Sequence, residues 1–98
     1  MAVIWTQRSR DDLADIFRFI ARDNRRAAER WVGRLLERAE LASVTPLGGR
    51  VVPEVRRDDL REVFERSYRI IYRVAADDIR ILTVFEGHRR LRPGDIEE

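Results

Sequence analysis

Glu54, Arg69 and His88 are the residues of this 98-residue chain whose types suit acid–base chemistry on a phosphodiester. Metal-free cleavage of RNA needs a base for the 2′-hydroxyl proton, a cation that stabilises the charged transition state, and an acid for the leaving 5′-oxygen. A glutamate, an arginine and a histidine fit those three roles in type. The sequence has no cysteine and only one histidine, so we expect no metal and no cofactor.

Each of these residues also has a simpler structural role. His88 follows a glycine at the end of a predicted strand, where a lone histidine is more often exposed or structural than catalytic. Arg69 lies mid-strand between apolar neighbours, and because an unpaired buried charge is costly, it must find a carboxylate or face a partner. Glu62, across the predicted hairpin, is the internal candidate. Glu54 lies in a basic loop, where we favour a surface ion pair with one of its arginines, Arg50, Arg56 or Arg57.

Basic side chains on and around the same strands could form a contact surface for a partner. Arg61 and Arg69 would share one anion site only if both point to the same face of the sheet. A two-residue turn at 66–67 pairs Phe64 with Arg69 and places Arg61 opposite Tyr72, on the other face. A longer turn or a bulge reverses this, so both arrangements stay open. The candidate contact residues are Arg50, Arg61, Arg69, Arg73, His88, Arg89 and Arg90.

Composition favours a single globular domain over residues 1–98. Hydrophobic residues make up 44% of the chain and charged residues 39%, which is typical of a folded, heavily solvated protein. All twenty basic residues are arginine, yet eighteen acids leave a net charge of only +2, so bulk electrostatics does not predict nucleic-acid binding. The N-terminus lacks the pattern of a signal peptide, and no apolar run approaches a membrane span. We therefore expect a cytoplasmic protein with no membrane partner.

The elements that must position these residues begin with a short apolar strand, Ala2–Trp5. A helix follows over about 8–23, because Leu13, Ile16, Phe17 and Ile20 fall on one helical stripe. After Asn24, a helix-capping residue, apolar side chains repeat at helical spacing to about Ser43. So short a connection predicts an antiparallel helical hairpin. Gly33 inside the second helix suggests a close approach to the first.

Three strand-like segments follow a loop over residues 45–59 that is rich in glycine, proline and arginine. They cover about 60–66, 68–74 and 79–86, and the two short turns between them predict an antiparallel meander. The last residues, about 90–98, contain Pro93-Gly94 and an acidic end, and we expect a flexible tail. The predicted fold is α+β, in the order β-α-α-β-β-β, with the helical hairpin packed on a small antiparallel sheet.

This order, with these residues, resembles the RelE/ParE superfamily of toxins from bacterial type II toxin–antitoxin modules. The resemblance covers nearly the whole chain. The matching pieces are Ile4-Trp5-Thr6, DLADIFRFIARDN, AAERWVGRLLERAELA, PLGGRVVPE, YRIIYRV and IRILTVFEGHR. The resemblance implies a small α+β toxin held inactive by a co-expressed antitoxin. RelE-like members cleave messenger RNA on the ribosome without a metal, whereas ParE-like members poison DNA gyrase.

Within the superfamily, Glu54, Arg69 and His88 match by position the glutamate, arginine and histidine of one ribonuclease branch. That branch has a tyrosine where this chain has Arg89, and the lysine-rich set of RelE itself is absent because the chain has no lysine. An arginine can hold a phosphate but cannot act as an acid. The ParE-like branch is therefore favoured, with inhibition of gyrase or another topoisomerase by direct binding. The alternatives are a ribosome-dependent mRNA endonuclease and a non-toxic co-repressor that only binds antitoxin.

The resemblance also implies partners. We expect a cognate antitoxin, of ribbon-helix-helix type, whose acidic C-terminal segment packs on the helical side of the toxin. Operator DNA would be bound only through the complex with antitoxin. The expected antitoxin contacts are Phe17, Arg18, Trp31, Arg34, Leu35 and Arg38.

Overall fold

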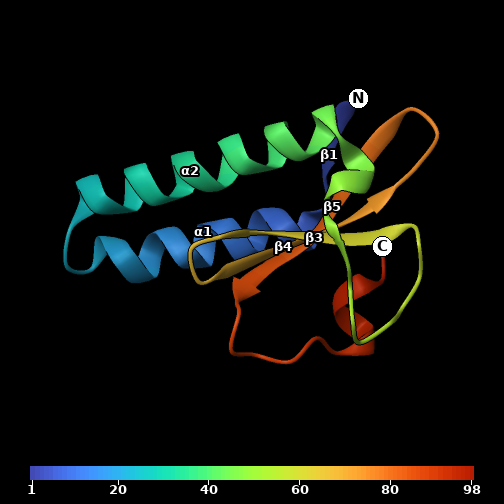
Figure 1. Ribbon diagram of the computed structural model, residues 1–98. Helices are drawn as coiled ribbons and strands as arrows, with labels where there is room; N and C mark the ends of the chain where they lie inside the picture. The colour runs from blue at the N-terminus through green and yellow to red at the C-terminus, as the bar shows by residue number, and fades with distance from the viewer.

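Two antiparallel helices cover one face of a five-stranded sheet in the computed structural model, which describes residues 1–98 (Figure 1). The α+β class and the order of the predicted elements are confirmed, and one short strand is added before the meander. Neither helix has a stretch long and apolar enough to span a bilayer. The elements are β1 (Ala2–Trp5), α1 (Gln7–Ala21), α2 (Arg25–Val44), η1 (Pro46–Gly48), β2 (Arg50–Val51), β3 (Leu60–Glu65), β4 (Tyr68–Val74), β5 (Asp78–Glu86) and η2 (Pro93–Ile96).

Both helices start at polar capping residues, of which Asn24 is predicted from the sequence. The Thr6 side chain accepts a hydrogen bond from the Ser9 backbone N–H at 3.2 Å, and Asn24 accepts one from the Ala27 backbone N–H at 3.0 Å. Each bond satisfies one of the N–H groups that a helix start leaves without a partner. The Thr6 hydroxyl also donates to the Ile81 carbonyl at 2.9 Å, which fixes the start of α1 on β5.

The sheet is mixed, in the order β1-β5-β4-β3-β2. The antiparallel meander of β3, β4 and β5 is confirmed. The expectation of a wholly antiparallel sheet is wrong at one edge, because β1 pairs in parallel with β5, from Ala2 opposite Asp78 to Trp5 opposite Ile81. Parallel neighbours need a long crossover connection, which the helices and the meander supply.

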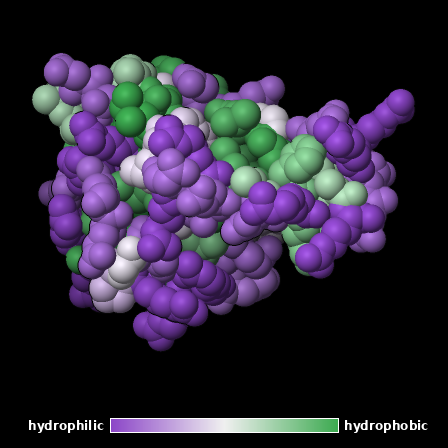
Figure 2. All heavy atoms as spheres, turned by 180° about the vertical axis from the view of Figure 1, so that it is seen from behind, coloured by the Kyte–Doolittle hydropathy of each residue, from purple (hydrophilic) through white to green (hydrophobic).

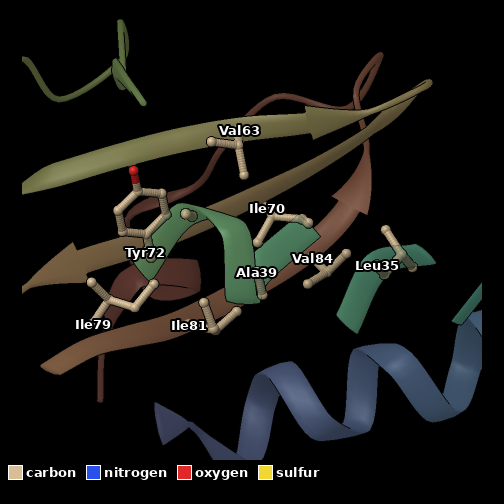
Figure 3. Packing of buried hydrophobic residues seen from close by; sticks show 9 residues of the cluster. Leu35, Ala39, Val63, Ile70, Tyr72, Ile79, Ile81 and Val84 are labelled. Carbon is tan, nitrogen blue, oxygen red and sulfur yellow. The ribbon is translucent and has the colours of Figure 1, made fainter. Parts of the chain in front are cut away.

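The main core lies between the sheet and α2. Side chains from β3, β4 and β5 point toward Leu35 and Ala39 of α2 in Figure 3. Burying a side chain such as Leu or Ile stabilises the fold by about 1.5–3 kcal/mol. The buried members are Leu35, Ala39, Ala42, Val63, Ile70, Tyr72, Ile79, Ile81 and Val84.

Tyr72 joins this core to the loop that follows α2. Its ring is fully buried, and its hydroxyl donates to the Pro46 carbonyl at 2.6 Å. Gly49 passes so close that a Cβ there would lie 2.3 Å from the Tyr72 hydroxyl oxygen. The glycine is therefore required by the close approach. Gly33 differs, since a Cβ there would meet nothing within 4 Å, so the close approach expected for it is wrong.

A second core lies on the outer face of the sheet, away from the helices. It contains Val52, Leu60, Ile71, Leu82 and Phe85, with Val55, Leu91 and Ile96 packed against it. The C-terminal segment, drawn in red, crosses this face in Figure 1. The expectation of a flexible tail over about 90–98 is therefore wrong for its middle, where Asp95 is only 4% exposed. Apolar residues on both faces of β4 need a cover on both sides, and the tail provides the second one.

Apolar residues also remain on the surface. Phe19, Leu41, Val44 and Leu47 are each exposed. The face seen in Figure 2 shows hydrophobic patches set among hydrophilic side chains. Charged groups therefore frame the apolar surface on this face.

Candidate functional site

The turn between β3 and β4 decides which arginines can act together. It contains two residues, Arg66 and Ser67, and Arg66 adopts a left-handed backbone conformation with φ of 52°. Phe64 therefore pairs with Arg69, and Arg61 lies opposite Tyr72. Cross-strand partners share a face, so Arg61 and Arg69 point to opposite sides of the sheet. A joint anion site of these two arginines is excluded.

Arg69 lies at the centre of a buried ion-pair network on the outer face. It is 5% exposed. Its Nε donates to Glu62 Oε1 at 2.9 Å, which confirms the predicted internal partner. Its two terminal nitrogens donate to the two carboxylate oxygens of Glu54, each at 2.9 Å. This bidentate geometry is the strongest form of an arginine–carboxylate pair.

Glu62 links this network to the edge strand. It is 1% exposed, and it accepts from Arg50 Nε at 2.7 Å as well as from Arg69. The Arg50 guanidinium also lies 5.5 Å from the centroid of the Phe64 ring. Burying a carboxylate is tolerable only when it is paired and hydrogen-bonded, and two arginines meet that need here.

Glu54 pairs with Arg69, so the expected ion pair with Arg50, Arg56 or Arg57 is wrong. A third hydrogen bond comes from the Leu91 backbone N–H, which donates to Glu54 Oε2 at 3.2 Å. The hydrogen bonds from Arg69 are the largest cause that lowers the pKa of Glu54 from 4.5 to about 2. The same bonds, together with those to Glu62, raise the pKa of Arg69. A carboxylate held in this way is a weak proton acceptor near neutral pH.

His88 stands apart from the other two predicted catalytic residues. Its side chain is 93% exposed, and its Nε2 lies 3.9 Å from Glu86 Oε1. No hydrogen bond or ion pair joins it to Glu54 or Arg69. The structure thus brings Glu54 and Arg69 together as partners of each other, while the histidine faces solvent at the end of β5.

Most of the other predicted contact arginines hold parts of the chain itself. Arg61 donates to loop carbonyls on the helical side of the sheet, with bonds of 2.8–3.2 Å. Arg73 and Arg89 each bind a carboxylate of the C-terminal segment. Arg89, in the position where the ribonuclease branch has a tyrosine, also stacks 4.3 Å from the centroid of the Phe85 ring. Arg90 is exposed and forms no ion pair.

Comparison with known proteins assigns the family. The family described as "ParE toxin of type II toxin-antitoxin system, parDE" matches residues 3–91 of the chain. The chain belongs to the ParE toxin family. A solved structure described as "Chromosomal ParDE TA system from P. aeruginosa" shares its fold, with a TM-score of 0.72 at 21% identity over 88% of this chain and 95% of that chain. No curated protein sequence gives a match. As a ParE toxin of a type II system, the chain has a cognate antitoxin as its partner.

The part of the chain that matches the ParE family ends at Leu91. Asp95 and Glu98 therefore lie beyond the matched residues, although they bind Arg89 and Arg73 inside them. The outer face of this ParE-family domain is thus completed by a segment outside the family match.

The helical side of this ParE toxin presents an aromatic and cationic patch. Trp31 of α2 and Tyr68 of β4 make an edge-to-face contact with ring centroids 5.9 Å apart. The guanidinium groups of Arg34 and Arg66 lie 5.3 and 5.8 Å from the centroid of the Trp31 ring. We call Trp31, Arg34, Arg66 and Tyr68 the Trp31 patch. Arg66 was missed by sequence reasoning, although its place in a two-residue turn signals an exposed side chain.

The other predicted antitoxin contacts differ in accessibility. Leu35 has no exposed surface, so its prediction as a contact residue is wrong; it lies on the inner stripe of α2 and fills the core. Phe17 is half-buried beneath the Arg25 guanidinium, and Arg18 is exposed beside Asp15. Arg38 donates to the Phe64 carbonyl at 3.3 Å and is half-buried.

Proposed function

We propose that this ParE toxin inhibits DNA gyrase or a related topoisomerase by direct binding, and that it performs no chemistry of its own. The observation that carries the proposal is the closed ion pair between Glu54 and Arg69. A general base must reach the proton that it removes, and a catalytic cation must have donors free for the reacting oxygens. In this chain the terminal nitrogens of Arg69 and the carboxylate oxygens of Glu54 are hydrogen-bonded to each other instead.

The remaining member of the predicted catalytic set supports the same conclusion. His88 is exposed and makes no contact with the Glu54–Arg69 pair. Arg89, beside it, binds Asp95 through both terminal nitrogens at 2.8 and 3.0 Å and has no proton to give near neutral pH. The arrangement favours a contact surface over a site for RNA cleavage.

We place the target contacts at the end of β5 and on the outer face of the sheet. His88 and Arg90 are the exposed members of the predicted set there. Arg73 is half-buried and can contribute when its bond to the C-terminal segment opens. Arg61 and Arg69 position the sheet and its loop instead of facing a partner. Gyrase as target would place the toxin's action in the cytoplasm.

The Trp31 patch is the proposed docking site of the antitoxin. Aromatic and arginine side chains are the types that most often anchor protein interfaces. Two guanidinium groups beside one indole ring favour a segment that carries both apolar and acidic side chains, and an acidic amphipathic antitoxin tail has that chemistry. Antitoxin of ribbon-helix-helix type would then connect the toxin to operator DNA.

Two assays on the purified chain test the proposed target. We expect inhibition of supercoiling by purified gyrase and no cleavage of mRNA in a translating extract. Arg90→Ala should weaken inhibition about fivefold, the effect of losing ~1 kcal/mol of contact energy. Arg22→Ala, at the exposed end of α1, is the matched control and should leave inhibition unchanged.

Two other outcomes would replace the proposal. Codon-specific cuts with intact supercoiling, abolished by Glu54→Gln, would identify an mRNA endonuclease. Absence of both activities would favour a chain that only binds antitoxin and represses its operator.

A further inference from the structure

Arg73 and Arg80 lie directly opposite each other on adjacent strands of the outer face. They are register partners in the β4–β5 ladder. Like charges in this position are destabilising unless a counter-charge lies between them. The chain supplies one, because the Glu98 carboxylate lies between the two guanidinium groups.

Glu98 binds Arg73 in bidentate fashion and reaches Arg80 as well. Arg73 Nε lies 2.7 Å from Glu98 Oε1 and its terminal nitrogen 3.2 Å from Oε2, while Arg80 lies 3.5 Å from the same Oε2. The hydrogen bond from Arg73 is the largest cause that lowers the pKa of Glu98. The Glu98 carboxylate therefore neutralises a pair of cations.

Arg80 is only partly satisfied by this arrangement. Its Nε is buried, lies 3.5 Å from Asp78 Oδ1, and has no hydrogen-bond partner; the same holds for that oxygen. The contact of Arg80 with Glu98, at 3.5 Å, is also longer than a normal hydrogen bond, whereas that of Arg73 is 2.7 Å. The pair can thus bind a carboxylate better placed than Glu98.

The segment that carries Glu98 is anchored upstream. Asp95 accepts bonds from Arg89 at 2.8 and 3.0 Å and from the Arg92 backbone N–H at 2.8 Å. Leu91 and Ile96 pack into the outer core. In contrast, Glu97 is exposed and forms no ion pair. Glu98 lies outside these anchors, so its side chain can leave its site while residues 91–96 stay packed.

We propose that Arg73 and Arg80 form a carboxylate-binding site that Glu98 occupies in the free toxin, and that an acidic segment of a partner protein displaces Glu98 from it. This inference rests on the proposed function, since it gives Arg73 its role in the target-binding surface. Glu98 thus competes with the partner for this site. Partner binding is weakened by the free energy needed to displace it.

The neighbouring charges favour an acidic protein segment over a nucleic acid. Asp78 lies beside Arg80, and Asp59 is held by Arg57. The hydrogen bond to Glu98 is the largest cause that raises the pKa of Arg73, and the negative charges of Asp59 and Asp78 raise it further. A continuous phosphate backbone would run past these carboxylates and be repelled, whereas a single side-chain carboxylate fits between the two guanidinium groups.

Binding of fluorescein-labelled hexaglutamate to the full chain, measured by fluorescence anisotropy at low salt, tests the site. Glu98→Gln should raise affinity about two- to fivefold, the range for loss of exposed ion pairs. Glu97→Gln removes the same charge one residue earlier and should have no effect. Adding Arg73→Gln to Glu98→Gln should abolish the gain. Equal affinities for Glu98→Gln and Glu97→Gln would overturn the inference.

A labelled twelve-residue oligothymidylate separates the two classes of partner. A gain in its affinity as large as that for hexaglutamate would overturn the assignment to an acidic protein segment. Neither probe involves gyrase, so the outcome is independent of the proposed target. If Glu98→Gln gains peptide affinity while the wild-type chain leaves gyrase unaffected, the site stands and the proposed function fails. If the wild type inhibits gyrase but Glu98→Gln gains nothing, only the site fails.

Discussion

Replacing Arg69 by methionine tests the buried ion-pair network. The change keeps a long side chain but removes its charge, and it leaves Glu62, which is 1% exposed, without its buried cation. Breaking a buried pair by removing one partner costs about 3–5 kcal/mol. Because Arg50 still binds Glu62 from the solvent side, we expect the lower end, about 3 kcal/mol. A surface pair offers the control: Arg57→Met removes a partner of Asp59 and should cost less than ~1 kcal/mol.

Urea unfolding, monitored by circular dichroism, measures the free energy of unfolding of both variants. The comparison requires that their m-values be similar. A third variant isolates the effect of the unpaired buried charge. Glu62→Gln combined with Arg69→Met removes the uncompensated buried charge and should be more stable than Arg69→Met alone. Equal losses of stability for Arg69→Met and Arg57→Met would refute the view that Glu62 is a buried charge dependent on Arg69. A double variant less stable than Arg69→Met would refute it as well.

Three further predictions concern pH and single side chains. The pKa of Glu54 falls from 4.5 to about 2 on folding because of its hydrogen bonds from Arg69, so its stabilisation is complete above pH 4.5 and is lost as the pH falls toward 2. Thermal unfolding across that window should show a smaller loss for Glu54→Gln than for the wild type; parallel curves would contradict this. Gly33→Ala should stabilise by about 0.5–1 kcal/mol, since a Cβ there meets nothing and helix propensity improves, whereas Gly49→Ala should destabilise by more than ~1 kcal/mol through the clash with Tyr72. Tyr72→Phe leaves the Pro46 carbonyl without its donor and should cost ~1 kcal/mol in urea unfolding, and a neutral result would show that this bond is replaced.

Local features of the fold were predictable because they depend on neighbours in sequence. Thr6 and Asn24 cap their helices as short polar residues before an apolar stripe should. The two-residue turn at Arg66-Ser67 is enough to derive the pairing of Arg61 with Tyr72, once the shorter of two possible turns is chosen. The parallel pairing of β1 with β5 was not predictable in this way, since it joins strands separated by most of the chain.

The candidate site was predictable in part, for the same reason. Glu62 lies across a short hairpin from Arg69, and its role as partner follows from strand geometry. Glu54 lies in an irregular loop, and no periodic pattern predicts which arginine forms an ion pair with it. A signal did exist for the packed tail: Ile71 and Leu82 need a cover on the outer face, and Leu91 and Ile96 are apolar residues in a segment otherwise rich in charge.

The Trp31 patch and the exposed target contacts His88 and Arg90 lie at the same end of the molecule, whereas Arg73 lies toward the other end of β4. Tyr68, in the Trp31 patch, pairs with Glu86 at the end of β5, and the Gly87 backbone N–H donates to the Ser67 carbonyl at 2.6 Å. This bond places His88, the next residue, close to the turn that carries Arg66. An antitoxin segment bound over the Trp31 patch would extend onto His88 and Arg90, two of the residues proposed to contact the target. An antitoxin that covers this shared edge would block those two contacts without any change in the fold of the toxin.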